Sequence, residues 1–190
     1  MIPLNDLLQQ VRACTLCDLP LGPNPVVRAQ ADARLLIIGQ APGTKVHYSG
    51  IPWHDPSGDR LRMWLDMDQQ AFYDASRVAI VPMAFCYPGK GKSGDLPPPP
   101  LCANTWHQAL LEQLPDIQTT LLLGKYAQDY YLGKSTESLT ERVRRWQEFA
   151  PRFWPMPHPS PRNQMWLRRN AWFEAEVIPA LREHLSVARK

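Results

Sequence analysis

Two cysteines in close spacing are the first residues of the chain that could do chemistry. Cys14 and Cys17 form a Cys-x-x-Cys pair, and Cys86 and Cys102 later bracket a loop of fifteen residues. Such a pair can form a disulfide, act as a redox pair, or supply two ligands of a metal site. In a reducing cytosol disulfides are rare, so we expect metal ligands, catalytic thiols or small buried hydrophobes.

Four thiolates brought together by a fold can bind zinc or a [4Fe-4S] cluster. Zinc ribbons typically present two tight Cys-x-x-Cys pairs, and the second pair is missing here. The spacing therefore favours the cluster over zinc, with four unrelated buried thiols as the alternative. A site closed by four cysteines has no open position for a substrate, so we expect it to fix the N-terminal helix and the 87–101 loop onto the sheet.

The elements that must position these cysteines follow from the apolar pattern. Four short apolar runs predict buried strands at 34–39, 77–85, 119–124 and 152–158. Helical periodicity is found at 4–13, about 58–66, about 102–114, 124–132 and about 163–186. Alternating apolar strands and helices predict an α/β fold, a three-layer α/β/α domain over residues 1–190 with a central four-stranded, mainly parallel sheet.

Composition limits the class of protein. A chain of 190 residues that is 44% apolar can bury one core but is short for two ordinary domains. No apolar run approaches the length of a membrane span, and no basic segment with an apolar run opens the chain, so we expect a cytoplasmic monomer with no membrane partner. The net charge of +3 does not by itself indicate a nucleic-acid partner.

Arginines and tryptophans gather late in the chain. The group consists of Arg142, Arg144, Arg145, Arg152, Arg162, Arg168 and Arg169 together with Trp146, Trp154, Trp166 and Trp172. Arginines beside tryptophans suit a surface that holds phosphates and stacks on bases. A solvated helix face with tryptophans in the core explains the same pattern.

Unusual sequence follows three of the predicted strands, where an α/β fold carries its functional residues. GQAPGTKVHYSGIPWHDPSGDRL follows the first, CYPGKGKSGDLPPPPLC the second and HPSPRN the fourth. Gly39 and Gly43 permit backbone positions that a side chain would obstruct, and Pro42 stiffens the turn between them.

These features resemble the iron–sulfur branch, families 4 and 5, of the uracil-DNA glycosylase superfamily. The four cysteines match its cysteine pattern, and Gly39 to Gly43 followed by GIPWHDPSGDRL match its first motif. His158 to Asn163 match its last motif, and HPSPRN is especially similar to the single-strand-selective branch. The resemblance covers nearly the whole chain in the right order.

The resemblance implies a DNA repair glycosylase that flips a deaminated base, uracil in first place, out of DNA and hydrolyses its N-glycosidic bond to leave an abasic site. It implies a [4Fe-4S] cluster on Cys14, Cys17, Cys86 and Cys102. Within the first motif, Trp53 stacks on the base, while the loop of Gly39, Gln40, Ala41, Pro42 and Gly43 binds the base edge. His158 donates a hydrogen bond to the leaving uracil. The residues that the resemblance assigns to holding the DNA backbone and filling the gap in the duplex are Ser160, Pro161, Arg162 and Asn163.

One departure from the family concerns the attacking water. Family 4 has Glu at the second position of the first motif, and other branches have Asp or Asn one residue later, whereas this chain has Gln40 and Ala41. A gapped alignment places the acid of family 5 at His47, which makes His47 our first candidate for the water-activating base. Asp55 and Asp59 rank behind it.

The other departure concerns the base. Pro82 stands where family 4 has an Asn that reads the uracil edge. Either Gln40 reads the base through its donor and acceptor, or the preferred base is another one, such as hypoxanthine. No lysine occupies a motif position from which it could form a Schiff base, so we expect a monofunctional enzyme. Lys45, in the first loop, is the one lysine that could be an exception.

Two other functions fit the sequence. A protein that binds damaged DNA or abasic sites on the same fold would lose little by lacking the carboxylate. A four-cysteine zinc module that binds nucleic acid is the third hypothesis.

Overall fold

Four buried strands form the centre of the computed structural model, which describes residues 1–188. The sheet order is β2-β1-β5-β6, and every neighbouring pair is parallel. The strands are β1 (Leu35–Ile38), β2 (Val78–Ile80), β5 (Thr119–Leu123) and β6 (Phe153–Met156). The predicted four-stranded sheet is confirmed, and it is wholly parallel.

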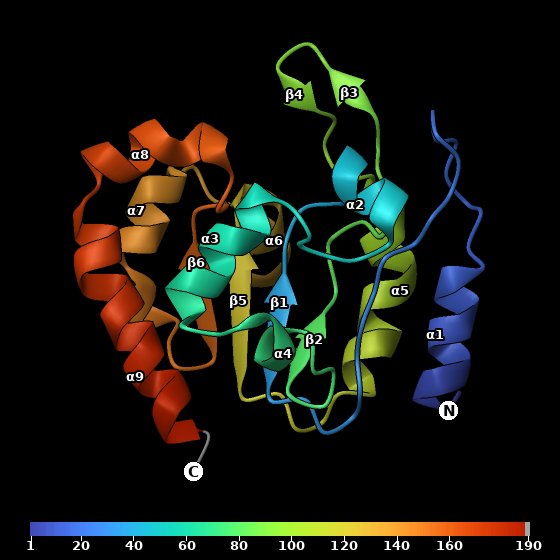
Figure 1. Ribbon diagram of the computed structural model, residues 1–190, viewed down its shortest axis with the longest axis horizontal. Coiled ribbons are helices and arrows are strands. Elements are labelled where there is room, and N and C mark those ends of the chain that lie inside the picture. Colours follow the sequence, from blue (N-terminus) through green and yellow to red (C-terminus); the bar gives the residue numbers. More distant parts are fainter. Residues whose placement is uncertain (189–190) are drawn as a thin grey trace.

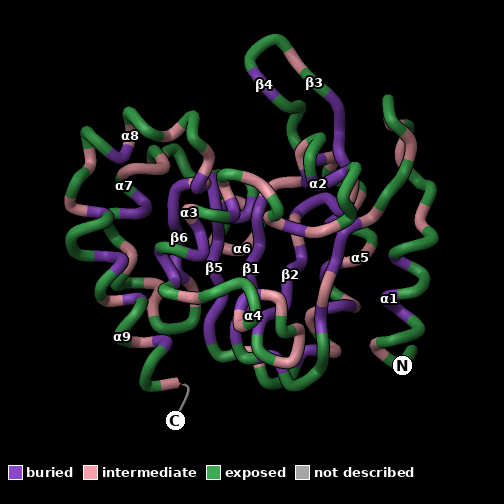
Figure 2. The backbone as a smooth tube through the Cα atoms, viewed as in Figure 1, coloured by how far each residue is buried: buried purple, intermediate pink, exposed green. Residues whose placement is uncertain are grey.

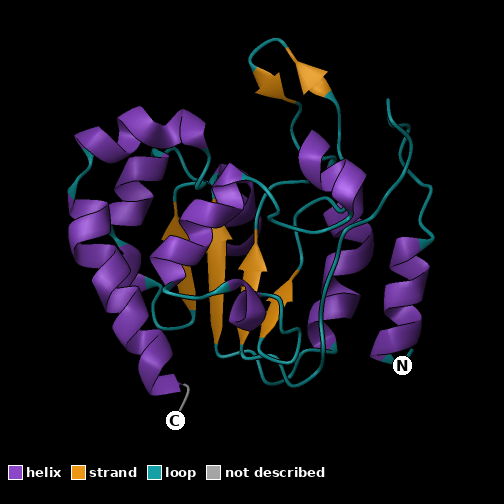
Figure 3. Cartoon of the chain, viewed as in Figure 1, coloured by secondary structure: helices purple, strands orange, loops and turns teal. Residues whose placement is uncertain are grey.

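Helices cover both faces of this sheet (Figures 1 and 3). Alternate residues of β1 point to opposite faces of the sheet: Leu35 and Ile37 lie in one apolar core, whereas Leu36 and Ile38 lie in the other. The first core is closed by α3 and α9, and the second by α1, α5 and α6. Burial on both faces explains why the strands are continuous apolar runs, and it confirms the α/β/α architecture.

The helices flank the strands in the following order: α1 (Leu4–Arg12), α2 (Thr44–Ser49), α3 (Pro56–Leu65), α4 (Gln69–Phe72), α5 (Pro100–Glu112), α6 (Lys125–Leu132), α7 (Leu139–Arg144), α8 (Gln164–Arg169) and α9 (Ile178–Ala188). Short 3₁₀ turns occur at Trp146–Glu148 and Pro161–Asn163. Within the described residues no helix is both long and apolar enough to cross a membrane.

Two predicted elements are shorter than expected. The strand expected at 77–85 ends at Ile80, since Pro82 has no N–H for a ladder and the chain turns into a loop. The helix expected at 163–186 breaks after Arg169 and resumes as a π-helical turn over Phe173–Val177 before α9. Pro179 explains this turn, because it cannot donate to the carbonyl one turn earlier.

An antiparallel hairpin escaped prediction altogether. It consists of β3 (Lys90–Gly91) and β4 (Gly94–Asp95), with Lys90 opposite Asp95. In Figure 1 the hairpin projects beyond the carboxyl edge of the sheet, and Figure 2 shows its turn as exposed. It therefore stands on the side where functional residues of such a fold are expected.

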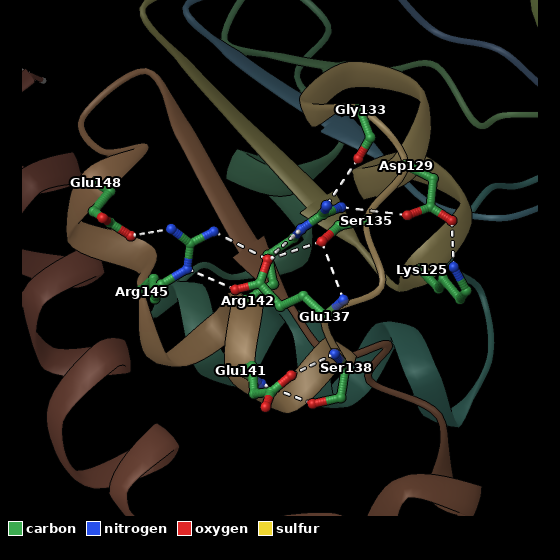
Figure 4. A network of polar contacts seen from close by, with 10 residues as sticks. All are labelled: Lys125, Asp129, Gly133, Ser135, Glu137, Ser138, Glu141, Arg142, Arg145 and Glu148. Carbon is green, nitrogen blue, oxygen red and sulfur yellow. Dashed lines mark hydrogen bonds and ion pairs between the residues drawn. The ribbon is translucent and has the colours of Figure 1, made fainter.

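Two of the late arginines are held by acids of their own domain and do not form a free basic surface (Figure 4). Arg142 is buried and donates to the carbonyl of Gly133 at 2.8 Å and to Asp129 at 3.3 Å. Arg145 binds Glu137 at 2.6 Å, and this hydrogen bond is the main reason that the pKa of Glu137 lies below its ordinary value. Arg142 thus ties α7 to the end of α6, and Arg145 ties the end of α7 to the segment before it.

The late tryptophans also pack against the protein. Trp154 is buried and stacks on Trp146 with 4.8 Å between ring centroids. Trp166 and Trp172 pack against the same core, and Arg144 lies 4.2 Å from the Trp172 ring. Trp154 is therefore a core aromatic, whereas Trp146, Trp166 and Trp172 are only partly buried against that core, and a base-stacking role for them stays a prediction.

A buried histidine fixes the loop after β2. His107 of α5 is 1% exposed, with Nε2 2.7 Å from the carbonyl oxygen of Pro82 and Nδ1 2.5 Å from the Tyr131 hydroxyl. The carbonyl can only accept, so Nε2 carries the proton and Nδ1 accepts from Tyr131. Burial lowers the pKa of His107 to about 4. The neutral ring thereby links α5 to the loop of Pro82.

This lowered pKa predicts a loss of stability in mild acid. The unfolded chain binds a proton near pH 6.5 and the folded protein only near 4, so stability is full above 6.5 and falls as the pH drops. From pH 7 to pH 5 His107 should cost about 2 kcal/mol of unfolding free energy. Urea unfolding at both pH values should show a smaller loss in His107→Gln than in the wild type. Equal losses in the two proteins would contradict the prediction.

Candidate active site at the carboxyl ends of the strands

A cavity of about 330 Å³ lies where β1, β2 and β6 end. The loops after these strands and the β3–β4 hairpin form its walls. Lining residues that matter below are Gly39, Gln40, Ala41, Pro42, Gly43, Trp53, Asp55, Ser57, Pro82, Ser93, Asp95, Leu96, His158, Ser160 and Arg162. Most of the predicted site residues are therefore brought together, whereas His47 and Asn163 are not among the lining residues.

The loop after β1 is tied to the loop after β2 by backbone hydrogen bonds. The carbonyl of Gly39 accepts from the amide of Met83 at 2.9 Å, and the carbonyl of Gln40 accepts from Ala84 at 3.0 Å. A side chain on Gly39 would stand 2.8 Å from the indole of Trp53. Glycine at position 39 is thus what allows the indole to lie against the end of β1.

Trp53 is held in an unusual backbone conformation. Its φ of 60° lies in the left-handed region, which costs energy for a bulky residue unless the surroundings fix it. Its carbonyl accepts from Nη1 of Arg62 at 3.1 Å, and a side chain on Gly58 would come within 1.7 Å of that carbonyl. The indole centroid lies 5.4 Å from that of His158, with the planes 32° apart.

Arg62 and Tyr73 form a supporting layer that the sequence did not reveal. Arg62 is buried, pairs with Asp59 at 2.9 Å and donates to the Tyr73 hydroxyl at 3.1 Å. The hydroxyl donates in turn to the carbonyl of Pro52 at 2.8 Å, and burial raises the pKa of Tyr73. The available signal was Arg62 itself, a charge within the apolar stretch RLRMWL of α3. Asp59 is occupied by this ion pair and does not line the cavity.

His158 lines the cavity as a neutral ring. Its Nδ1 accepts from the backbone amide of Ser160 at 3.2 Å, and Asn163 donates to its carbonyl at 2.7 Å. Burial lowers the pKa of His158 to about 4. With Nδ1 acting as acceptor, the proton of the neutral ring sits on Nε2, so His158 is a hydrogen-bond donor at pH 7.

The HPSPRN loop is hydrogen-bonded to the β3–β4 hairpin. Arg162 donates from Nη1 to the carbonyl of Ser93 at 2.6 Å, and a side chain on Gly94, whose φ is 121°, would meet this guanidinium at 2.1 Å. The Ser160 hydroxyl accepts from the Arg162 amide at 3.2 Å. Ser160, Arg162 and Asn163, which the resemblance assigns to DNA, are thus engaged in bonds that shape the loop and its contact with the hairpin.

His47 lies beside the cavity and not in its wall. On α2 its neighbour Val46 lines the cavity, while His47 is turned toward Tyr87, 6.2 Å away between ring centroids. Successive residues of a helix point about 100° apart, which explains why only one of the two faces the cavity. The buried Nδ1 of His47 has no hydrogen-bond partner among the described residues. Lys45 of the same helix does not line the cavity either.

Two carboxylates do line the cavity. Asp55 caps α3, and its Oδ1 accepts from the amide of Gly58 at 2.8 Å. Asp95 of the hairpin lies near Gly43, 3.6 Å from where a Cβ of that glycine would stand. Asp95, like Ser93 and Leu96, escaped the sequence analysis because a separate loop brings it to the site.

The four cysteines line a second, largely apolar cavity at the start of α5. The thiol of Cys102 accepts from the amide of Phe85 at 3.3 Å, and burial raises the pKa of Cys102 to about 12. All four are free thiols, and within residues 1–188 no three Cys, His, Asp or Glu side chains already stand in positions that would ligate a single metal ion. Thiols are the only ligand type in these walls, so the donor set fits a thiophilic metal or an iron–sulfur cluster.

A comparison with protein families agrees with this geometry. The family model described as the uracil DNA glycosylase superfamily matches residues 27–182. The matched part contains the loops that form the active-site cavity, together with Cys86 and Cys102, and it begins after Cys14 and Cys17. The match spans most of the chain, so the protein belongs to the uracil DNA glycosylase superfamily, whose members are DNA glycosylases.

Proposed function

We propose that this protein is a monofunctional DNA repair glycosylase that flips a deaminated base, uracil in first place, into the cavity and hydrolyses its N-glycosidic bond. We take it to act as a cytoplasmic monomer. The observation that carries the proposal is the neutral His158, which offers an Nε2–H donor beside the Trp53 indole in the cavity wall. An aromatic face with a fixed donor beside it suits a flat base that departs as an anion.

Each step of the proposed reaction has a residue in the cavity. The base stacks on Trp53, whose backbone is held by Arg62. As the glycosidic bond breaks, Nε2–H of His158 donates to the O2 atom of uracil, where negative charge develops. Because the ring is already neutral, this donation needs no change of protonation at pH 7.

We assign the attacking water to Asp55 in place of His47. Asp55 lines the cavity, and only its Oδ1 is used in capping α3. An ionised carboxylate can orient the water, accept its proton and stabilise the cationic sugar as the bond breaks. His47 has no comparable access, since Val46 takes its place in the wall.

Gln40 is our proposed reader of the base edge. Pro82 has no side-chain amide, and its carbonyl is taken by His107. The Gln40 carboxamide offers a donor and an acceptor in the cavity wall, which suits the paired N–H and C=O groups of uracil and equally of hypoxanthine. The proposal therefore places uracil first and hypoxanthine second.

A protein that binds abasic DNA without turnover is the second candidate. One observation favours it: neither Gln40 nor Ala41 supplies the carboxylate that glycosylases of this kind carry in the first loop. The role of Asp55 decides between the two functions.

We also propose that Cys14, Cys17, Cys86 and Cys102 hold a [4Fe-4S] cluster, with zinc as the alternative. Support comes from their common cavity and from the lack of any other ligand type in its walls. Such a cluster would fix the segment after α1 and the start of α5 against the loop of Phe85, and all chemistry at the base would remain with the cavity residues.

The first prediction concerns His158. Base release from oligonucleotides that carry uracil, hypoxanthine or xanthine, single- or double-stranded, should fall at least about 100-fold in His158→Ala because the leaving anion loses its donor. His54→Ala, which changes an exposed histidine outside the cavity, is the control and should keep full activity. No release by the wild type, together with tight binding to abasic DNA, would favour the second candidate.

The second prediction separates Asp55 from His47. Asp55→Asn keeps a side chain that caps α3 but loses the carboxylate, so base release should fall about 100-fold or more while binding to abasic DNA persists. His47→Gln and the wild type should differ from each other by only a few-fold. Single-turnover rates at pH 7 test this. Loss of turnover in His47→Gln with an active Asp55→Asn would return the role to His47.

The third prediction concerns the metal centre. Protein purified without oxygen should be brown, with absorbance near about 400 nm and about four irons and four sulfides per chain. Cys102→Ala should lose this absorbance and unfold at a lower temperature. A colourless protein with one zinc per chain would replace the cluster by zinc.

A further inference from the structure

Trp106 lies in the wall of the four-cysteine cavity and takes no part in the active site. It follows Cys102 by four residues on α5, so both side chains lie on the same face of the helix, one turn apart. Helical side chains lean toward the N-terminus of their helix, which brings the indole over the turn that carries Cys102. Trp106 is therefore placed to cover the cavity from the side of α5.

The indole nitrogen of Trp106 is buried and has no hydrogen-bond partner among the described residues. Three other tryptophans that pack in the apolar core have a partner, since Trp64 donates to Glu174 at 3.0 Å, Trp154 to a carbonyl at 3.1 Å and Trp166 to Thr140 at 2.8 Å. Leaving a buried donor unpaired is unfavourable, because the group has lost its hydrogen bonds to water. A buried donor without a partner in the wall of a thiol-lined cavity points to an acceptor that belongs to this cavity.

Sulfur is the acceptor type that this cavity supplies. One of the thiols, Cys102, already receives a backbone N–H group, from Phe85. The remaining walls are mostly apolar, formed by Leu16, Leu19, Leu101 and several prolines. A negatively charged cluster in such surroundings gains from every N–H group aimed at its sulfurs.

We propose that Trp106 donates its Nε1–H to a sulfur of the iron–sulfur cluster held by the four cysteines, and that its ring shields the cluster from water. This inference rests on the proposed cluster and goes beyond it by naming a residue that tunes it. Reduction adds negative charge to the cluster, so an N–H donor stabilises the reduced form more than the oxidised form. Removal of the donor should make the reduction potential more negative.

The test compares Trp106→Phe with the wild type and with Trp166→Phe, a remote control whose Nε1 partner is Thr140. Phenylalanine keeps an aromatic shield but has no N–H. With equal iron and sulfide contents, the reduction potential of Trp106→Phe should be more negative than that of both other proteins. Its absorbance near about 400 nm should also bleach faster in air.

A second measurement uses the wild-type protein alone, in case the variant fails to fold or to load. Pulsed magnetic resonance of the reduced cluster should detect coupling to the indole proton of Trp106, identified by ¹⁵N-labelled tryptophan and lost in D₂O. A loaded wild type without this coupling, or a loaded Trp106→Phe with unchanged potential, overturns the inference and leaves the cluster in place. If the wild-type protein carries zinc, both the cluster proposal and this inference are overturned. The glycosylase activity is tested separately by the base-release assay.

Discussion

The carbonyl of Trp53 is the point on which the active-site cavity depends. Arg62 can donate to it at 3.1 Å because the guanidinium is buried and held by Asp59 and Tyr73. Gly58 must remain without a side chain to leave room for this carbonyl. These constraints hold Trp53 in the left-handed region, from which its indole reaches Gly39 and His158. A strained residue fixed from several sides is typical of functional positions.

Much of the fold could be predicted from the apolar runs, because strands buried on both faces have no other pattern available. Where the prediction of an element failed, a few individual residues were responsible. Pro82 shortened β2, and Pro179 led to a π-helical turn before α9. The hairpin of β3 and β4 has too few residues to show a periodicity, and it depends on Gly94 at positive φ beside Arg162. Gly94 and Arg162 are far apart in the sequence, so the local sequence cannot predict their contact.

For the site, motifs predicted which loops meet but not which side chains face inward. His158 and Trp53 belong to these motifs, and both line the cavity. His47 and Val46 are neighbours in sequence, and only the orientation of α2 decided that Val46 lines the cavity. Asp95 comes from a separate loop, so no spacing within the first motif could reveal it. The supporting bonds of Arg62 depend on burial, which composition does not show.

The loop from Pro82 to Cys86 joins the two cavities. Pro82 lines the active-site cavity and its carbonyl is held by His107, while Ala84 donates to the carbonyl of Gln40. The next residue is Phe85, whose amide donates to the thiol of Cys102, and Cys86 lines the thiol cavity. Any group that fixes these thiols therefore also fixes the backbone that holds Gln40 in place. A metal centre without an open coordination position can in this way support base recognition through the shared loop, with no part in the bond-breaking step.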